Sequence, residues 1–330
     1  MLFRSGLSGA EIDWFSRRFH EIASNVERVI QGKRTVIDLV LACLLAEGHV
    51  IVEDVPGVGK TLLAKSLARS IECESSRIQF TPDLLPSDVT GVSVWDRQRG
   101  EFTFKPGPIF SNIVIGDEIN RASPKTQAAM LEAMEERQVT YDGVTRPLET
   151  PFMVIATQNP LEHEGTYPLP EAQLDRFMMR VELGYPSHAT TLEILDTHGV
   201  RSTYLDLMPV ATAKDVLAMV EVAQTVGVSE PVKHYIIDIV EATRSHPDIL
   251  LGASTRAALF LLRLSRVWAA AAGRDFVLPD DVKQLAVPVL AHRMALRPEA
   301  VIRGSEMSQV IAEILDHLEV PGTVSRSTAS

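Results

Sequence analysis

The chain has 330 residues, which is enough for two domains at roughly 100–200 residues each. Its composition is that of an ordinary globular protein, with 45% hydrophobic and 23% charged residues. The 32 basic and 43 acidic residues give a formal net charge of −11, which excludes an overall electrostatic attraction to nucleic acid or to an anionic membrane surface.

Three features predict a cytoplasmic protein with no membrane segment. The chain contains two cysteines, Cys43 and Cys73, too few for a disulfide framework, and this indicates a reducing compartment. The longest apolar stretch, residues 36–46, is shorter than the roughly 20 residues that a membrane-spanning helix needs, and it carries Asp38. Residues 1–10 lack the basic run and apolar region of a secretory signal.

In chain order, helical and strand-like patterns alternate through the first half. Helices are predicted where apolar residues recur at spacings of three and four, and strands where short β-branched or apolar runs occur. The expected helices are 11–30, 36–46, 61–71 and 124–136. The expected strands are 49–53, 112–116, 152–156 and 179–183. This alternation predicts an α/β fold, with a mainly parallel sheet covered by helices on both faces.

Two hairpins are predicted to be inserted in this region. One pairs residues 92–95 with 101–104 around Arg99-Gly100, and the other spans 139–148 around Asp142-Gly143. After Pro186 the strand-like runs largely stop. A capping box, Thr212 to Asp215, begins a series of helices, with others expected at 231–243, 255–272 and 280–294. We therefore expect a nucleotide-binding core at 1–186 and an α-helical domain at 187–330.

A glycine-containing loop lies between the first predicted strand and the helix that begins at Thr61. Gly57 and Gly59 let backbone N–H groups turn toward phosphate oxygens, and the helix start adds the positive end of its dipole. Lys60 would reach the β- and γ-phosphates of ATP, and Thr61 would ligate Mg²⁺. The general pattern G-x-x-x-x-G-K-[ST] has glycine where this chain has Asp54, so the motif needs support from elsewhere in the chain. The loop residues expected to bind nucleotide are Pro56, Gly57, Val58, Gly59, Lys60, Thr61 and Leu62.

Two acidic residues supply that support. Asp117 and Glu118 directly follow the strand expected at 112–116. Beside a phosphate loop, one acid holds the magnesium shell and the other polarises a water. We therefore assign Asp117 to Mg²⁺ and Glu118 to the role of general base in the attack on the γ-phosphate. An acidic pair alone is often a solvated loop, but its occurrence together with Lys60 and Thr61 favours catalysis.

Three further polar residues are candidates for the same site. Asn159 follows the strand expected at 152–156, and in a parallel sheet it would lie beside Glu118, where it could orient the attacking water. Arg176 precedes the last predicted strand and Arg256 begins a helix of the second domain. Each arginine offers a fixed charge and a planar donor fork for phosphate. A turn at Asn159 and a surface salt bridge at each arginine are the structural alternatives.

Taken together, these motifs resemble those of the AAA+ superfamily of ATPases, and their amino-acid sequences resemble the MoxR family within it. The matching segments are 53–61 (EDVPGVGKT), 117–122 (DEINRA), 131–136 (LEAMEE), 156–160 (ATQNP) and 170–177 (PEAQLDRF). The likeness extends from about Glu11 to about Met294, and such long literal matches are far more specific than the glycine loop alone. The resembling family tolerates aspartate at position 54.

The resemblance implies a nucleotide held between the core and a small helical lid, in a site that the neighbouring subunit of a ring completes. A hexameric ring is expected. Arg176 would be the arginine finger that acts on the next subunit's ATP, and Arg256 would be a sensor that reaches the γ-phosphate from the lid of the same chain. Arg121 is a further candidate for a contact across the interface. The residues that lie where the family builds its adenine pocket are Val29, Ile30 and Gln31.

The implied function is ATP-driven remodelling of client proteins, including their maturation or metal insertion. Such proteins often act with partners that carry von Willebrand factor A domains, and in related proteins the inserted hairpins often face the ring pore. Two alternatives remain: a nucleic-acid motor of the MCM type, and the ATPase subunit of a magnesium-chelatase-type complex. The net charge of −11 and the lack of a zinc motif argue against nucleic acid as a partner. The magnesium-chelatase alternative shares the same chemistry and differs from remodelling only in the client protein.

Overall fold

The computed structural model describes residues 8–55, 57–159, 166–198 and 203–321. The chain divides into two compact units. The core unit comprises residues 17–221, and the lid unit comprises the residues from 222 onward together with those before residue 17. The domain limit that we predict at Pro186 falls inside the core unit.

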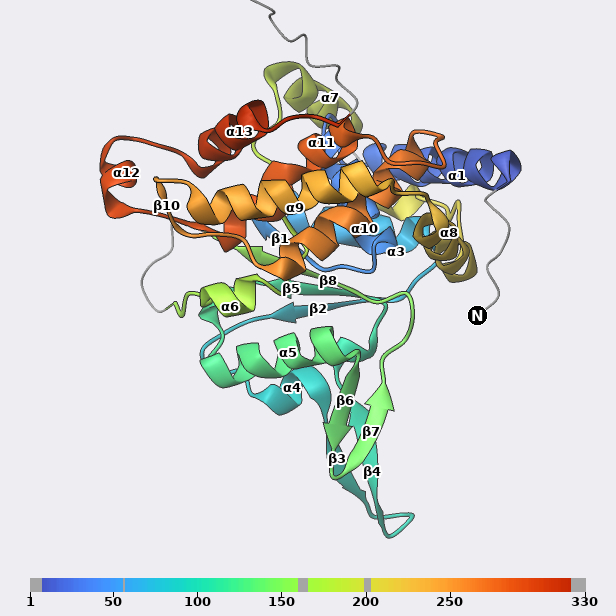
Figure 1. Ribbon diagram of the computed structural model, residues 1–330. Coiled ribbons are helices and arrows are strands. Elements are labelled where there is room, and N and C mark those ends of the chain that lie inside the picture. Colours follow the sequence, from blue (N-terminus) through green and yellow to red (C-terminus); the bar gives the residue numbers. More distant parts are fainter. Residues whose placement is uncertain (1–7, 56, 160–165, 199–202, 322–330) are drawn as a thin grey trace, which may run out of the picture. The chain divides into compact units, whose positions relative to one another are not determined.

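The helices and strands up to residue 225 follow the predicted alternation (Figure 1). The helices are α1 (Gly9–Glu27), α2 (Arg34–Leu45), α3 (Lys60–Ser70), α4 (Pro86–Thr90), α5 (Pro124–Glu136), α6 (Glu171–Leu174), α7 (His188–His198) and α8 (Ala213–Thr225). The strands are β1 (Val50–Glu53), β2 (Ser75–Gln79), β3 (Gly91–Asp96), β4 (Glu101–Pro106), β5 (Ile113–Asp117), β6 (Gln138–Tyr141), β7 (Val144–Pro147), β8 (Met153–Gln158) and β9 (Met179–Val181). The Ser123 hydroxyl caps α5 by accepting from the Thr126 N–H, with Pro124 at the first helical position, as the sequence predicts.

Five strands form one sheet in the order β2-β5-β8-β1-β9, and every pair of neighbours in it is parallel. This confirms the predicted α/β class. Because parallel strands place their carboxyl ends at the same edge, the residues that follow β1, β5 and β8 come together there. The edge holds the loop after Glu53, the acids at Asp117 and Glu118, and Asn159. The sheet thus determines where the candidate site lies.

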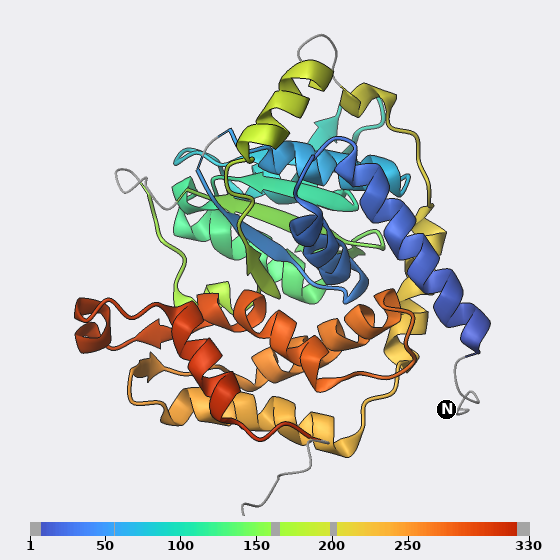
Figure 2. The same ribbon diagram turned by 90° about the horizontal axis from the view of Figure 1, so that it is seen from above.

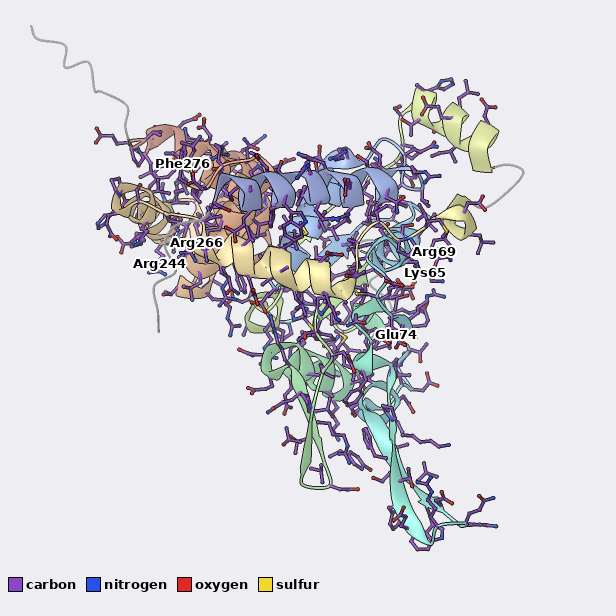
Figure 3. All side chains as sticks on the ribbon, turned by 90° about the vertical axis from the view of Figure 1, so that its right-hand side faces the viewer. Lys65, Arg69, Glu74, Arg244, Arg266 and Phe276 are labelled. Carbon is purple, nitrogen blue, oxygen red and sulfur yellow. The ribbon has the colours of Figure 1, made fainter. Side chains whose placement is uncertain are left out.

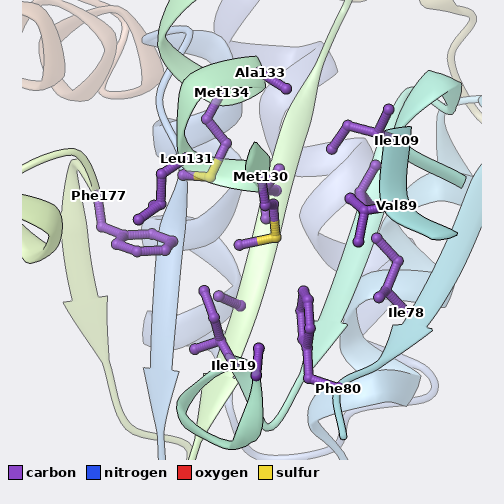
Figure 4. Close-up of a cluster of buried hydrophobic side chains, with 14 of the residues drawn as sticks. Ile78, Phe80, Val89, Ile109, Ile119, Met130, Leu131, Ala133, Met134 and Phe177 are labelled. Atoms are coloured by element: carbon purple, nitrogen blue, oxygen red, sulfur yellow. The ribbon is translucent and has the colours of Figure 1, made fainter. Parts of the chain in front are cut away.

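Helices cover both faces of the sheet. On one face a buried cluster joins α4, α5 and the strands, and its largest members include Phe80, Met130 and Phe177 (Figure 4). On the other face lie α2 and α3, whose apolar residues, such as Leu41 and Leu63, are also fully buried (Figure 2). Burial on both faces explains why β1, β5 and β8 read as nearly continuous apolar runs.

The two predicted hairpins are present and project together from the core unit (Figure 1). In β3–β4, Asp96 pairs with Glu101, and in β6–β7, Tyr141 pairs with Val144. The hairpins contact each other. The Ser93 hydroxyl lies 2.9 Å from an Asp142 carboxylate oxygen, and the Phe104 and Tyr141 rings have centroids 5.8 Å apart. The sequence therefore predicted both hairpins but not their association.

The strand β2 is absent from the sequence-based prediction. Its residues alternate between the two faces of the sheet, and only Ile78 is buried. An edge strand with a single apolar anchor lacks the apolar run by which the other strands could be recognised. The omission matters because Arg77 and Gln79 lie on the exposed face of this strand.

The core unit continues past Pro186 because the later segment is hydrogen-bonded to α3. The Arg69 guanidinium on that helix donates to the carbonyls of Leu207 at 2.6 Å and Leu205 at 2.9 Å (Figure 3). The Val210 and Ala211 N–H groups both donate to the Ser70 carbonyl. These hydrogen bonds hold residues 205–211 against α3.

The lid unit is mainly helical, and it also contains a short antiparallel ribbon, β10 (Ile249–Leu251) with β11 (Ala295–Leu296). Its helices after residue 225 are α9 (Glu230–Ser245), α10 (Thr255–Ala271), α11 (Pro279–Leu290), α12 (Pro298–Ile302) and α13 (Met307–His317). The Arg244 guanidinium of α9 donates to the Ala253 carbonyl at 2.9 Å, just before α10 begins (Figure 3). Within the described ranges, every helix is too short or too polar to span a bilayer.

A buried histidine at the start of β1 makes stability depend on pH. His49 Nε2 lies 3.1 Å from the Met134 carbonyl, and Nδ1 accepts the Val154 N–H at 3.0 Å. This arrangement requires a neutral ring with its proton on Nε2. Burial is the main cause that lowers the His49 pKa from 6.5 to about 4.

We expect this histidine to destabilise the fold as the pH falls from 6.5 toward 4. In that range the unfolded chain takes up a proton that the folded chain does not, so the free energy of unfolding falls by up to about 1.4 kcal/mol per pH unit. Above pH 6.5 both states are neutral and the effect vanishes. Urea unfolding of His49→Gln should show a flatter pH dependence, whereas His188→Gln, at an exposed position, should match the wild type. Equal slopes for all three proteins would contradict this prediction.

Candidate functional site

The glycine loop has the backbone conformation that a phosphate loop requires. Gly57 has φ +86° and Gly59, which caps the start of α3, has φ +98°. Both lie in the left-handed region that favours glycine. A Cβ atom at Gly57 would meet nothing within 4 Å, so backbone conformation, and not space, calls for glycine there. Val58, between the two glycines, and Leu62, in the first turn of α3, are half-buried, and Pro56 lies outside the described residues.

Asp54 explains how the chain does without the first glycine of the general pattern. One carboxylate oxygen accepts the Val55 N–H at 2.8 Å, and the other accepts the Gly184 N–H at 2.6 Å. Its own N–H donates to the Gln158 carbonyl at 3.1 Å. Together these contacts hold the first residue of the loop to β8 and to the segment that follows β9, the two strands that flank β1. A glycine at this position would make none of the contacts of the carboxylate.

Lys60, Thr61 and Asp117 converge at the carboxyl edge of the sheet. The Thr61 hydroxyl lies 3.1 Å from Asp117 Oδ2, and the Lys60 ammonium donates to the Asp54 carbonyl at 2.6 Å. Asp117 is buried, and its other oxygen accepts from the Thr157 hydroxyl at 3.3 Å. A hydroxyl beside a buried carboxylate is the kind of oxygen donor set that Mg²⁺ takes together with nucleotide phosphates.

Glu118 begins a sharp turn directly after β5. Its φ of +57° is uncommon for a residue other than glycine, and its N–H donates to the Thr157 hydroxyl at 3.0 Å. The carboxylate oxygen Oε2 accepts from Gln79 at 3.0 Å and from Arg121 at 2.9 Å. Arg121, our candidate for a contact between subunits, thus forms an ion pair with Glu118 of its own chain.

Asn159 is buried just beyond the end of β8, and β8 lies between β5 and β1. This places Asn159 between the strand that ends at Asp117 and the strand that leads into the glycine loop. The predicted adenine-pocket residues lie near the same loop. Val29 and Ile30 are buried, Gln31 is half-buried, and Ile30 Cδ1 would be 3.8 Å from a Cβ atom placed on Gly59.

The two remaining arginines lie away from this edge or in the other unit. Arg176 pairs with Glu135, near the end of α5, at 2.9 Å. Two residues later, the Met178 N–H donates to the His49 carbonyl, at the amino end of β1. Arg176 therefore lies near the amino ends of the strands, whereas the glycine loop lies at their carboxyl ends. Arg256 is half-buried in the first turn of α10 in the lid unit.

Three residues that contact Asp117 or Glu118 were not predicted from the sequence. Arg77 contacts Asp117 at 2.6 Å, Gln79 contacts Glu118, and Thr157 contacts both acids. Thr157 stood within a matched motif but was given no role. For Arg77 and Gln79 the only signal was their i, i+2 spacing in the unpredicted strand β2.

Comparisons with known proteins agree with this architecture. Residues 49–179 match the ATPase family associated with various cellular activities (AAA), and residues 241–314 match the AAA lid domain. The chain is 50% identical to the uncharacterised protein YeaC of Bacillus subtilis over 90% of this chain and 93% of the relative. It is 39% identical to the chaperone MoxR1 of Mycobacterium tuberculosis over 94% of this chain and 84% of the relative.

Among solved structures, a candidate ATPase from Cytophaga hutchinsonii superposes with a TM-score of 0.88 at 40% identity, covering 94% of this chain and 97% of that one. Full-length similarity at this identity extends the relationship from the glycine loop through the lid. These findings confirm the predicted family and the predicted combination of a parallel-sheet domain with a helical lid. The chain therefore belongs to the MoxR family of AAA+ ATPases.

Proposed function

We propose that the chain hydrolyses ATP in the presence of Mg²⁺ and uses the cycle, as a ring, to remodel client proteins. The observation that supports this most directly is the convergence of three elements at one edge of the sheet. These are the glycine loop with Lys60, the Thr61–Asp117 contact of 3.1 Å, and Glu118 in the adjacent position. In ATP-hydrolysing proteins these parts hold the phosphates, the metal and the attacking water.

The residues present fit a magnesium ion. Thr61 and Asp117 would hold it, because a hydroxyl and a carboxylate are hard oxygen donors that suit this ion. When bound, the ion supplies neutralisation of the charge that develops on the phosphate oxygens. The loop N–H groups and the start of α3 would bind the phosphates, with Lys60 on the β- and γ-groups.

Hydrolysis itself requires a water positioned for attack on the γ-phosphorus. Glu118 would accept the proton of this water, and Asn159 would orient the water through its amide. Glu118 starts the turn after β5, and Asn159 follows the neighbouring strand β8, so the two come from adjacent strands. Arg256 would reach the γ-phosphate from the lid of the same chain, as the family resemblance implies.

The position of Arg176 supports the proposal of a ring. Arg176 lies near the amino end of β1, and the glycine loop follows its carboxyl end. The four residues of β1 span about 13 Å. The Arg176 side chain pairs with Glu135, away from the loop. It therefore cannot stabilise charge at its own chain's loop. We propose that it acts as the arginine finger for the next subunit of a ring, expected to be hexameric.

The proposed clients are other proteins. The relative named chaperone MoxR1 supports this class, and the hairpin β3–β4 exposes two aromatic rings, Trp95 and Phe102, that could contact a polypeptide. Partners with von Willebrand factor A domains belong to the same proposal. A cytoplasmic location does too, and it is supported by the low cysteine content of two, Cys43 and Cys73. Strong stimulation of ATP hydrolysis by DNA would instead favour the nucleic-acid motor.

Nucleotide binding provides a direct test. Lys60→Ala should weaken ATP binding by about 10- to 100-fold, because it removes a charge-assisted hydrogen bond to the phosphates. Titration with a fluorescent ATP analogue would measure the change. Lys65→Ala is a matched control, because Lys65 lies on the same helix (Figure 3). Among the described residues, Lys65 has no hydrogen-bond or ion-pair partner. Unchanged affinity in Lys60→Ala would overturn the assignment of the loop.

A further inference from the structure

The exposed face of the edge strand β2 carries two polar side chains beside the candidate site. Arg77 and Gln79 are two residues apart and so point to the same side of the sheet. In the parallel pairing of β2 with β5, Gln79 is level with Asp117 and Arg77 is level with Ile115. The pairing register therefore brings both side chains to the two acids at the end of β5.

Arg77 shares one carboxylate oxygen with the candidate metal site. Its Nε lies 2.6 Å from Asp117 Oδ2, the same oxygen that lies 3.1 Å from the Thr61 hydroxyl. The other oxygen of Asp117 accepts from Thr157. A fixed positive charge is thus hydrogen-bonded to the atom that we propose as part of the magnesium site.

The same guanidinium also connects to Glu118. Its second terminal nitrogen donates to the Gln79 side-chain carbonyl at 2.7 Å, and the Gln79 amide donates to Glu118 Oε2 at 3.0 Å. One continuous set of hydrogen bonds therefore runs from Asp117 through Arg77 and Gln79 to Glu118. Movement of Arg77 away from Asp117 would also remove the partner that orients Gln79.

We propose that Arg77 is a positioning residue that competes with Mg²⁺ for Asp117 and thereby sets the magnesium concentration that nucleotide binding requires. This proposal rests on the proposed function. Pairing of Arg77 with Asp117 occupies the oxygen that the metal needs, so Arg77 has to leave Asp117 before Mg²⁺ can bind there. Glu118 would keep its ion pair with Arg121 during this exchange.

The exposure of the pair makes such an exchange feasible. The Arg77 side chain is 51% exposed, whereas that of Asp117 is 8% exposed. An arginine that is half in water contributes little to stability and can return to solvent at small cost. Asp117, which is buried, needs a positive partner in either state, because a buried carboxylate without one is costly. The buried acid would thus be paired at every step while the two cations exchange.

The test measures the magnesium requirement of nucleotide binding, separately from catalysis. Binding of N-methylanthraniloyl-ADP would be titrated against Mg²⁺ for the wild type, Arg77→Gln, Arg77→Lys and the control Arg97→Gln, whose arginine is exposed in the β3–β4 hairpin. Arg77→Gln should lower the Mg²⁺ concentration at half-saturation by about fivefold, because the competing charge is gone. Arg77→Lys keeps the charge and should restore most of the wild-type value, and Arg97→Gln should not differ from the wild type.

A second arm separates this role from a structural or direct phosphate-binding one. In EDTA, all four proteins should bind the same nucleotide with equal affinity. Weaker binding by Arg77→Gln in EDTA would overturn the proposal, as would equal Mg²⁺ half-saturation in all variants. In either case wild-type binding would leave the proposed function standing. Failure of the wild type itself to bind nucleotide would instead overturn the proposed function.

Discussion

Replacing Glu118 by glutamine should slow ATP hydrolysis by about 10²- to 10⁴-fold while ATP binding persists. The amide is nearly isosteric with the carboxylate but cannot accept the proton of the attacking water. Glutamine can still accept from Gln79 and Arg121, the two partners of Glu118 Oε2, so the turn after β5 should keep its geometry. Phosphate release under saturating ATP measures the rate, and binding of a fluorescent ATP analogue measures the affinity.

A carboxylate elsewhere in the core unit serves as the control. Glu149 is exposed between β7 and β8, and Glu149→Gln should hydrolyse ATP at the wild-type rate. Hydrolysis by Glu118→Gln at more than a tenth of the wild-type rate would exclude Glu118 as the general base. Asn159 or a residue of the neighbouring subunit would then be the next candidate for activating the attacking water.

Arg176→Ala should lower the hydrolysis rate by about 10³- to 10⁵-fold, the range of effects known for arginine fingers. The effect should fall on kcat, because the finger stabilises charge that develops in the transition state. The substitution also leaves Glu135 without its ion-pair partner, but both side chains are about one-third exposed, so the cost in stability should be small. Thermal unfolding would verify that the variant folds.

Mixed assemblies test whether the arginine acts on another copy of the chain. Arg176→Ala and Glu118→Gln would be co-expressed with different affinity tags and purified through both tags. A site then regains activity wherever an Arg176→Ala subunit supplies Glu118 and its neighbour supplies Arg176. Random mixing should restore about one quarter of the wild-type rate, since both halves of each site must be intact. A mixed assembly as inactive as its two parents would rule out action between subunits.

The central strands could be predicted from the sequence because both of their faces are buried. β5 and β8 are apolar along almost their full length, and each is followed at once by polar residues. Parallel strands share a carboxyl edge, so the proximity of Asp117 and Asn159 follows from the strand assignment alone. The glycine loop and the first turn of α5 were equally recognisable, since each depends on a few residues with a known conformational role.

The edge strand and its contacts could not be predicted in the same way. β2 buries only Ile78, and a single apolar residue has no period. The role of Arg77 depends on the register between β2 and β5, which is a long-range property of the folded sheet. Asp54 is a related case: the sequence marked it as a departure from a pattern, but its partner Gly184 is 130 residues away along the chain.

Connectivity gives the two inserted hairpins short routes to the candidate site residues Asp117 and Asn159. β4 leads through a single turn into β5, which ends at Asp117, and β7 leads into β8, which ends one residue before Asn159. Both receiving strands are interior strands, hydrogen-bonded on each side, and resist local bending. Load applied at the joined hairpins would therefore be transmitted along the length of these strands. If the proposed hydrolysis takes place, a movement of Asp117 or Asn159 would reach the hairpins through the same two strands.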